Sequence, residues 1–135
     1  MSDDACSSHC ARTCDCSPVV LDQVNAQGSA WLFVTGESLA AYCRDFLAVR
    51  RNAAASDDQQ LQRYAVCLGF VAGVSDAVTV EGVRRYCLPF RSDAGAITEA
   101  VAKYLDQRPK ELHLPAYTLV VQSLTSAYPC PGNAR

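Results

Sequence analysis

Half of the cysteines in the chain stand close together near its start. The sequence has eight cysteines in 135 residues, and four of them flank His9 or follow it closely: Cys6, Cys10, Cys14 and Cys16. Thiolates with a nearby imidazole are soft ligands that can hold zinc in a tetrahedron. The spacing C-x3-C-x3-C-x-C, however, lacks the paired C-x-x-C that is typical of zinc sites. We therefore predict local disulfides or an irregular arm here, and no metal site.

The other four cysteines fall in segments that we predict to be helices or helix ends: Cys43, Cys67, Cys87 and Cys130. Four cysteines can pair in three ways. In an up-and-down arrangement with short loops, the end of one helix lies near the start of the next, which favours Cys43–Cys67 and Cys87–Cys130. Each disulfide would stabilise the domain by about 2–4 kcal/mol. The alternative is buried free thiols that pack as small apolar side chains.

The cysteine content bears on the cellular compartment. Eight cysteines in a small chain are typical of an oxidising compartment such as the periplasm, the cell surface or the outside of the cell. The start MSDDACSSHCARTCDCSPVV is acidic and lacks the apolar segment of a signal peptide. Three explanations stay open: the chain is a mature form, its start codon is misplaced, or it stays cytosolic with reduced thiols.

Signatures of catalysis are missing from the sequence. It contains no G-x-S-x-G, no P-loop and no H-E-x-x-H. His9 and His113 are the two histidines, and nothing in the sequence orients either of them against a cysteine nucleophile. Asp76 stands between Val74 and Val78 in an apolar run, where a buried charge would need partners. We predict that Asp76 makes a structural hydrogen bond to a loop or to a facing Arg or Tyr, and that the chain is no enzyme and has no cofactor.

Composition favours one folded domain. Half of the residues are apolar and 19% are charged, which supplies enough apolar material for a core. A net charge of −2 gives no basic field that would attract nucleic acid. No uninterrupted apolar stretch reaches the length of a membrane span, so we expect no membrane insertion.

The stretch CLGFVAGVSDAV at residues 67–78 indicates a central helix. Its large apolar residues recur at helical spacing, and a first turn from Leu61 to Tyr64 makes the run too long for a typical strand. Because it is apolar nearly all round, we expect it to be buried among the other helices.

Small residues recur every fourth position along this helix: Ala65, Gly69, Gly73 and Ala77. Each glycine costs a helix about 1 kcal/mol relative to alanine. Close approach of a neighbouring helix would compensate for this cost. We therefore expect Gly69 and Gly73 to be helix-packing positions, and Gly73→Leu to destabilise the domain.

Three further helices complete the predicted fold. The first is capped by Thr35 and ends near Arg51, the third is capped by Ser92 or Asp93, and the fourth begins at Pro115. The fold class is therefore all-α: a compact four-helix domain with a core cross-linked by disulfides, at residues 31–131. An irregular cysteine-rich arm at residues 1–30 precedes it, and residues 132–135 form a tail.

Five pieces of the chain, in order, resemble the Rap/Tai family of type VI secretion immunity proteins. They are TGESLAAYC, CLGFVAGVSDA, YCLP, VAKYLDQRPKELHLPAYTLVVQSL and YPC. They run from about Thr35 to Cys130 and include the four cysteines of the helical domain. The cysteine-rich arm and the missing signal peptide depart from the family pattern.

The resemblance implies a small α-helical periplasmic protein, often a dimer, that is not an enzyme. Known members bind a peptidoglycan amidase effector delivered by rival or sister cells and block its active-site cleft. Family complexes use a surface loop and the adjoining helix surface, which we place on the loop from Gln107 to His113. Its polar candidates for partner binding are Arg108, Lys110, Glu111 and His113. The alternative is that this loop is an ordinary solvated connection.

Two interpretations of other classes stay open. The piece YCRDFLAV and a later cysteine faintly resemble the HdeA-type acid-stress chaperones, which implies a Cys43–Cys87 pair. Such a periplasmic holdase would loosen in acid, with carboxylates such as Asp76 as its switch. A disulfide-stabilised structural module of the envelope would need no partner surface. An amidase-like reading frame beside the gene would favour immunity over both.

Overall fold

The structure is a computed structural model, and it describes residues 33–132. These form four α-helices: α3 (Gly36–Arg51), α4 (Asp58–Val80), α5 (Ala94–Asp106) and α6 (Ala116–Ala127). Two short 3-10 turns, η1 (Ala53–Ala55) and η2 (Pro109–Glu111), lie in the connections. The predicted all-α, four-helix fold is confirmed. The predicted arm at residues 1–30, with its Cys6, Cys10, Cys14, Cys16 and His9, lies outside the described residues.

Side chains just before three of the helices fix where those helices begin. Each accepts a hydrogen bond from a backbone N–H of the first turn, which would otherwise lack a partner: Thr35 from Ser38, Asp57 from Gln60, and Asp93 from Ala96. The predicted cap at Thr35 is confirmed, and of the two candidates for the third helix the chain uses Asp93. The second helix is longer than predicted because Asp57 caps it one turn before Leu61.

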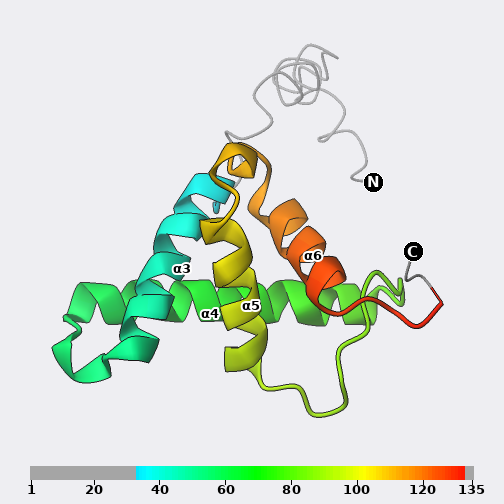
Figure 1. The fold of residues 1–135 in the computed structure, drawn as a ribbon, viewed down its shortest axis with the longest axis horizontal. Coiled ribbons are helices and arrows are strands. Elements are labelled where there is room, and N and C mark those ends of the chain that lie inside the picture. Colours follow the sequence, from blue (N-terminus) through cyan, green and yellow to red (C-terminus); the bar gives the residue numbers. More distant parts are fainter. Residues whose placement is uncertain (1–32, 133–135) are drawn as a thin grey trace, which may run out of the picture. The chain divides into compact units, whose positions relative to one another are not determined.

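Helix α4 lies across α3, α5 and α6 rather than alongside them (Figure 1). The core is the space that these helices enclose, and its largest fully buried side chains come from all four of them: Leu39, Phe46, Val71, Val101, Leu105, Leu119, Val120 and Leu124. The Phe46 ring stacks on Tyr64 with 4.9 Å between the ring centroids, which joins α3 to α4.

Two disulfides cross-link the domain. Cys43 pairs with Cys67 across 5.1 Å between Cα atoms and ties α3 to α4, and Cys87 pairs with Cys130 across 4.8 Å. Both predicted pairs are confirmed, so these four cysteines are not free thiols. The up-and-down geometry from which we predicted them is not the one observed, because α4 crosses its neighbours (Figure 1). Cys43 and Cys67 lie in the middle of α3 and α4, which contact each other, and Cys87 and Cys130 lie in the segments that follow α4 and α6.

The expectation that Gly69 and Gly73 pack against another helix is wrong. Both glycines are exposed, and a Cβ atom added at either position would meet no atom within 4 Å. The neighbouring small residues Ala65 and Ala77 are exposed as well. Helix α4 buries its other side, through residues such as Cys67, Val71, Val74 and Val78. A run that is apolar on both sides gives no periodic signal for which side faces the core.

Close backbone contact occurs instead at Gly36, the first residue of α3. A Cβ atom there would collide with the carbonyl oxygens of Leu112 and Leu114. One residue earlier, Thr35 forms an isolated β-bridge with Pro115. The start of α3 is therefore held directly against the connection between α5 and α6, and only glycine leaves room for that contact.

Helix α4 has 23 residues and is long and apolar enough to cross a membrane by length and composition alone. From the sequence we had expected no apolar stretch of that length. The same helix contacts α3, α5 and α6 and is covalently joined to α3. The core helix of a water-soluble domain satisfies the same criterion.

Candidate functional site

The four predicted partner-binding residues lie together in the connection between α5 and α6. Two of them bind each other: Arg108 Nη1 lies 3.2 Å from Glu111 Oε1. Tyr104 supports the pair from the last turns of α5. Its hydroxyl donates to Glu111 Oε2 at 3.4 Å, and the Arg108 guanidinium lies 4.4 Å from the centre of its ring. Arg108 and Glu111 therefore give the loop its shape.

The other two predicted residues, Lys110 and His113, are exposed. The His113 Nδ1 atom lies 2.9 Å from the backbone oxygen of Lys110. Since a carbonyl oxygen only accepts, Nδ1 carries the proton, and Nε2 of the neutral ring remains an acceptor for a partner. The Lys110 ammonium forms no ion pair with a described residue. Lys110 and His113 are therefore the exposed residues among the four that take no part in the Arg108–Glu111 pair.

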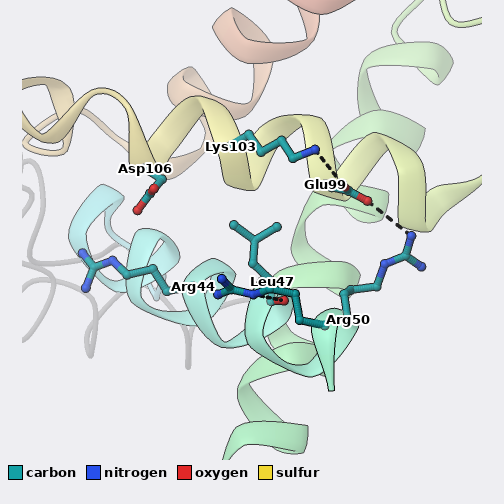
Figure 2. A pocket seen from close by; sticks show the side chains of 7 residues that line it. Arg44, Leu47, Arg50, Glu99, Lys103 and Asp106 are labelled. Carbon is teal, nitrogen blue, oxygen red and sulfur yellow. Dashed lines mark hydrogen bonds and ion pairs between the residues drawn. The ribbon is translucent and has the colours of Figure 1, made fainter. Parts of the chain in front are cut away.

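A second polar surface lies between α3 and α5 and was not predicted. It is a groove of about 620 Å³, lined by Arg44, Leu47, Arg50, Arg51, Glu99, Lys103 and Asp106. Figure 2 shows Lys103 and Arg50 reaching toward Glu99 from opposite sides, with Asp106 placed above Arg44. Four cations face two carboxylates, so the groove is positive overall and suits an acidic surface.

Glu99 is the electrostatic centre of this groove. Lys103 Nζ lies 2.7 Å from one of its carboxylate oxygens, and Arg50 Nη2 lies 3.3 Å from the other. The Lys103 ammonium, and after it the Arg50 guanidinium, holds the pKa of the Glu99 carboxyl below its ordinary value. The sequence held a signal for this surface: Glu99, Lys103 and Asp106 share one side of α5 by their spacing. Arg50 and Arg51 stand in the last turn of α3, where cations favour the helix dipole, so their charge alone does not indicate a groove.

With this geometry in place, the chain can be compared with known proteins. A family model described as Rap1a immunity proteins matches residues 35–130. The chain belongs to the Rap1a immunity protein family. The match runs from the Thr35 cap to Cys130 and so spans all four helices and both disulfides. Comparison with curated proteins and with solved structures finds no significant match.

Membership of the Rap1a family confirms the resemblance predicted from the sequence pieces. It gives the chain the role of an immunity protein, which binds a partner effector. The surfaces that matter are therefore those that a partner can reach, such as the loop at residues 107–113 and the groove between α3 and α5.

Two kinds of reactive group can be checked in the described part of this Rap1a protein: free thiols and clusters of metal ligands. All four cysteines between residues 33 and 132 are in disulfides, so none of them is a thiol nucleophile. Within the same residues, no group of three or more His, Cys, Asp or Glu side chains could hold a metal ion.

The prediction that Asp76 is a buried structural tie is wrong. Asp76 is exposed and forms no ion pair with a described residue, because it stands at an open hollow between α4 and the start of α5. The buried polar residue of this region is its neighbour Ser75, whose hydroxyl donates to the Val71 carbonyl oxygen at 2.9 Å. Neighbouring residues of a helix point in directions about 100° apart, so Ser75 can be buried while Asp76 is exposed.

Proposed function

We propose that this chain is an immunity protein that binds a type VI secretion peptidoglycan amidase and blocks its active-site cleft. The observation that carries this proposal is the family match over residues 35–130. The resemblance of the sequence pieces to the Rap/Tai family supplies the class of effector. The proposed protein acts by occupying a surface and performs no reaction of its own.

The loop at residues 107–113 is the proposed contact with the effector. Lys110 and His113 face outward and are free to bind, whereas Arg108 and Glu111 hold each other. The loop is backed by the close contact between Gly36 and the residues before α6. A loop held in one shape loses little conformational freedom on binding, which favours affinity. The sum of these contacts supports a rigid surface loop that inserts without refolding.

The periplasm is the proposed place of action. Two disulfides join the domain, and disulfides persist in oxidising compartments. We further propose that the free protein is a homodimer, as the resemblance implies. Helix α4 is proposed to be a core helix and not a membrane span, because its neighbours α3, α5 and α6 pack on it.

The chaperone hypothesis has less support from the structure. Its cysteine pair, Cys43–Cys87, is not formed, since Cys43 bonds to Cys67. Its acid switch needs a carboxylate whose charge is buried, and Asp76 is exposed. The remaining alternative is a structural module without a partner, and a binding experiment distinguishes it from an immunity protein.

The experiment is a binding and inhibition assay with the purified, oxidised chain. Peptidoglycan amidases are tested one by one, starting with any encoded beside the gene of this chain. The expected result is tight one-to-one binding to one amidase, by calorimetry, with parallel loss of peptidoglycan hydrolysis. An unrelated peptidoglycan hydrolase serves as the control and should keep its activity. Absence of binding to every amidase would refute the proposal and leave the structural module.

A further inference from the structure

Large apolar side chains are exposed along the end of α4 and the connection from α4 to α5. Phe90 is 91% exposed, Val83 is 50% exposed, and Val80 at the end of α4 is 87% exposed. Each alone would be unremarkable on a protein surface. Together they occupy one segment of 11 residues, which runs from the end of α4 toward the start of α5, and the start of α5 is the end opposite to the loop at residues 107–113 (Figure 1).

Phe90 stands at the tip of a tight turn. The Ser92 N–H and the Ser92 hydroxyl both donate to the Pro89 carbonyl oxygen, at 3.1 and 2.6 Å. This closes a four-residue turn with Phe90 and Arg91 at its two central positions. Arg91 has a φ of 60°, in the left-handed region that side chains other than Gly, Asn and Asp rarely adopt. Strained backbone of this kind is concentrated at functional positions.

The turn is fixed to the rest of the domain at its base. Cys87 is bonded to Cys130, and its N–H donates to the Tyr128 carbonyl oxygen at 2.9 Å. The Thr125 hydroxyl on α6 lies 3.2 Å from the Arg85 carbonyl oxygen and 2.7 Å from the Val121 carbonyl oxygen of its own helix, so its one proton is shared between these two acceptors. The exposed Phe90 is therefore presented by a braced segment and keeps its position without a partner.

Charges of both signs surround the turn: Glu81 and Asp93 are exposed in the same connection, and Asp76 lines the hollow that contains Arg91. Arg84, Arg85 and Arg91 are exposed, and none of them forms an ion pair with another residue in the described range 33–132. The chain as a whole carries a net charge of −2, so this concentration of free arginines is local. Their guanidinium groups remain available to bind carboxylates of a partner at close range.

Two hollows lie along this connection, and the turn residues Pro89, Arg91 and Ser92 line the first of them. One, of about 330 Å³, lies between α4 and the start of α5 and has Arg91 on its wall; the other, of about 220 Å³, contains Val83, Arg84 and Tyr86. Thr79 lines both, so they are neighbours. In the second, the Tyr86 hydroxyl is buried and has no hydrogen-bond partner among the described residues. Burial raises the pKa of this phenol, and the Ser75 hydroxyl nearby offsets only part of that effect.

We propose that the turn at residues 89–92 is the anchor with which the chain holds its effector. Phe90 enters an apolar groove of the effector, and Arg84, Arg85 and Arg91 face carboxylates at the edge of that groove. Aromatic and arginine side chains dominate the binding energy of protein interfaces, because they bury a large area and bond at its rim. This inference rests on the proposed function and assigns the main contact to residues outside the loop at 107–113.

The test compares two substitutions of exposed apolar residues. Phe90→Ser removes the proposed anchor, and Val66→Ser removes an apolar side chain of α4 that is 42% exposed and lies away from the turn. Both variants should keep the parent melting temperature, which shows that they fold. The dissociation constant for the amidase is then measured with each. Loss of an anchor residue weakens binding by roughly 30-fold or more, so this is the expected effect of Phe90→Ser, while Val66→Ser stays near the parent value.

A second variant guards against an effect on folding. Reversing two charges, with Arg84→Glu and Arg85→Glu together, should slow association with the amidase and reduce its dependence on salt. If the parent binds an amidase and Phe90→Ser binds it as tightly as Val66→Ser does, the anchor is refuted and the proposed function stands. If the parent binds no amidase, the proposed function fails and the anchor fails with it.

Discussion

Substitution of Gly73 by alanine should make the domain more stable. Gly73 lies inside α4 with ordinary helical backbone, and an added Cβ atom would meet no atom within 4 Å. Nothing is lost in packing, so only the helix propensity changes. Alanine exceeds glycine by about 1 kcal/mol in an exposed helix interior. The expected gain in the free energy of unfolding is therefore about 0.5–1 kcal/mol.

Urea denaturation followed by circular dichroism measures this gain directly. The midpoint should rise while the slope with urea stays the same, because the surface exposed on unfolding does not change. In a thermal scan, 1 kcal/mol corresponds to about 4–8 °C for a domain of this size. The oxidised chain is used, so that both disulfides remain intact in parent and variant.

Gly36→Ala is the matched control, since it makes the same chemical change at a glycine in contact with backbone. The new Cβ atom would collide with the carbonyl oxygens of Leu112 and Leu114, which cannot rotate away as a side chain would. Overpacking of this kind costs roughly 1–3 kcal/mol. If Gly73→Ala instead destabilises the domain, that side of α4 is covered by something, and the account of an open face is refuted.

Three further outcomes follow from the same structure. Replacing Cys43 and Cys67 together by alanine should lower the free energy of unfolding by about 2–4 kcal/mol, measured by urea denaturation; a loss below 1 kcal/mol would contradict the role given to this cross-link. Glu99→Gln should remove a pH dependence: because the folded-state pKa is lowered, the stability that Glu99 contributes is present above its ordinary pKa of 4.5 and is lost as the pH falls through the lowered value. Parent and variant melting temperatures should therefore differ near neutral pH and converge in acid; a constant difference would contradict this. Lys110→Glu should leave the melting temperature unchanged and weaken binding to the effector roughly tenfold or less, as expected for a contact at the edge of an interface. An unaltered dissociation constant would show that residues 107–113 are an ordinary solvated loop and not a contact with the effector.

Much of the fold could be predicted from local chemistry. Thr35 and Asp93 indicate where helices begin, because a short polar side chain before an apolar periodic run can accept a hydrogen bond from a free backbone N–H of the first turn. Both disulfide pairs were predicted correctly, but from a helix arrangement that the structure does not have, since Cys43 and Cys67 lie in the middle of their helices and not at the ends. The caps depend only on a few neighbouring residues, and for that reason the sequence alone indicates them.

The facing of α4 could not be predicted in the same way. Apolar side chains stand on both of its sides, so the periodicity does not indicate which side faces the core. We therefore predicted Asp76 and Gly73 to be buried, whereas both are exposed. The backbone contact at Gly36 joins residues far apart in sequence and leaves no local pattern. The same holds for the turn at Phe90, whose exposure depends on how its flanks are fixed to α6.

Protection of living cells tests the central claim most directly. The amidase that the purified chain binds is directed to the periplasm of a bacterium, where it lyses the cell, and the full chain is directed to the same compartment. The account predicts that cells making the chain survive, and that a chain restricted to the cytoplasm gives no protection. Continued lysis, with chain and amidase both present in the periplasm at comparable amounts, would contradict the proposal that this protein is an amidase immunity protein.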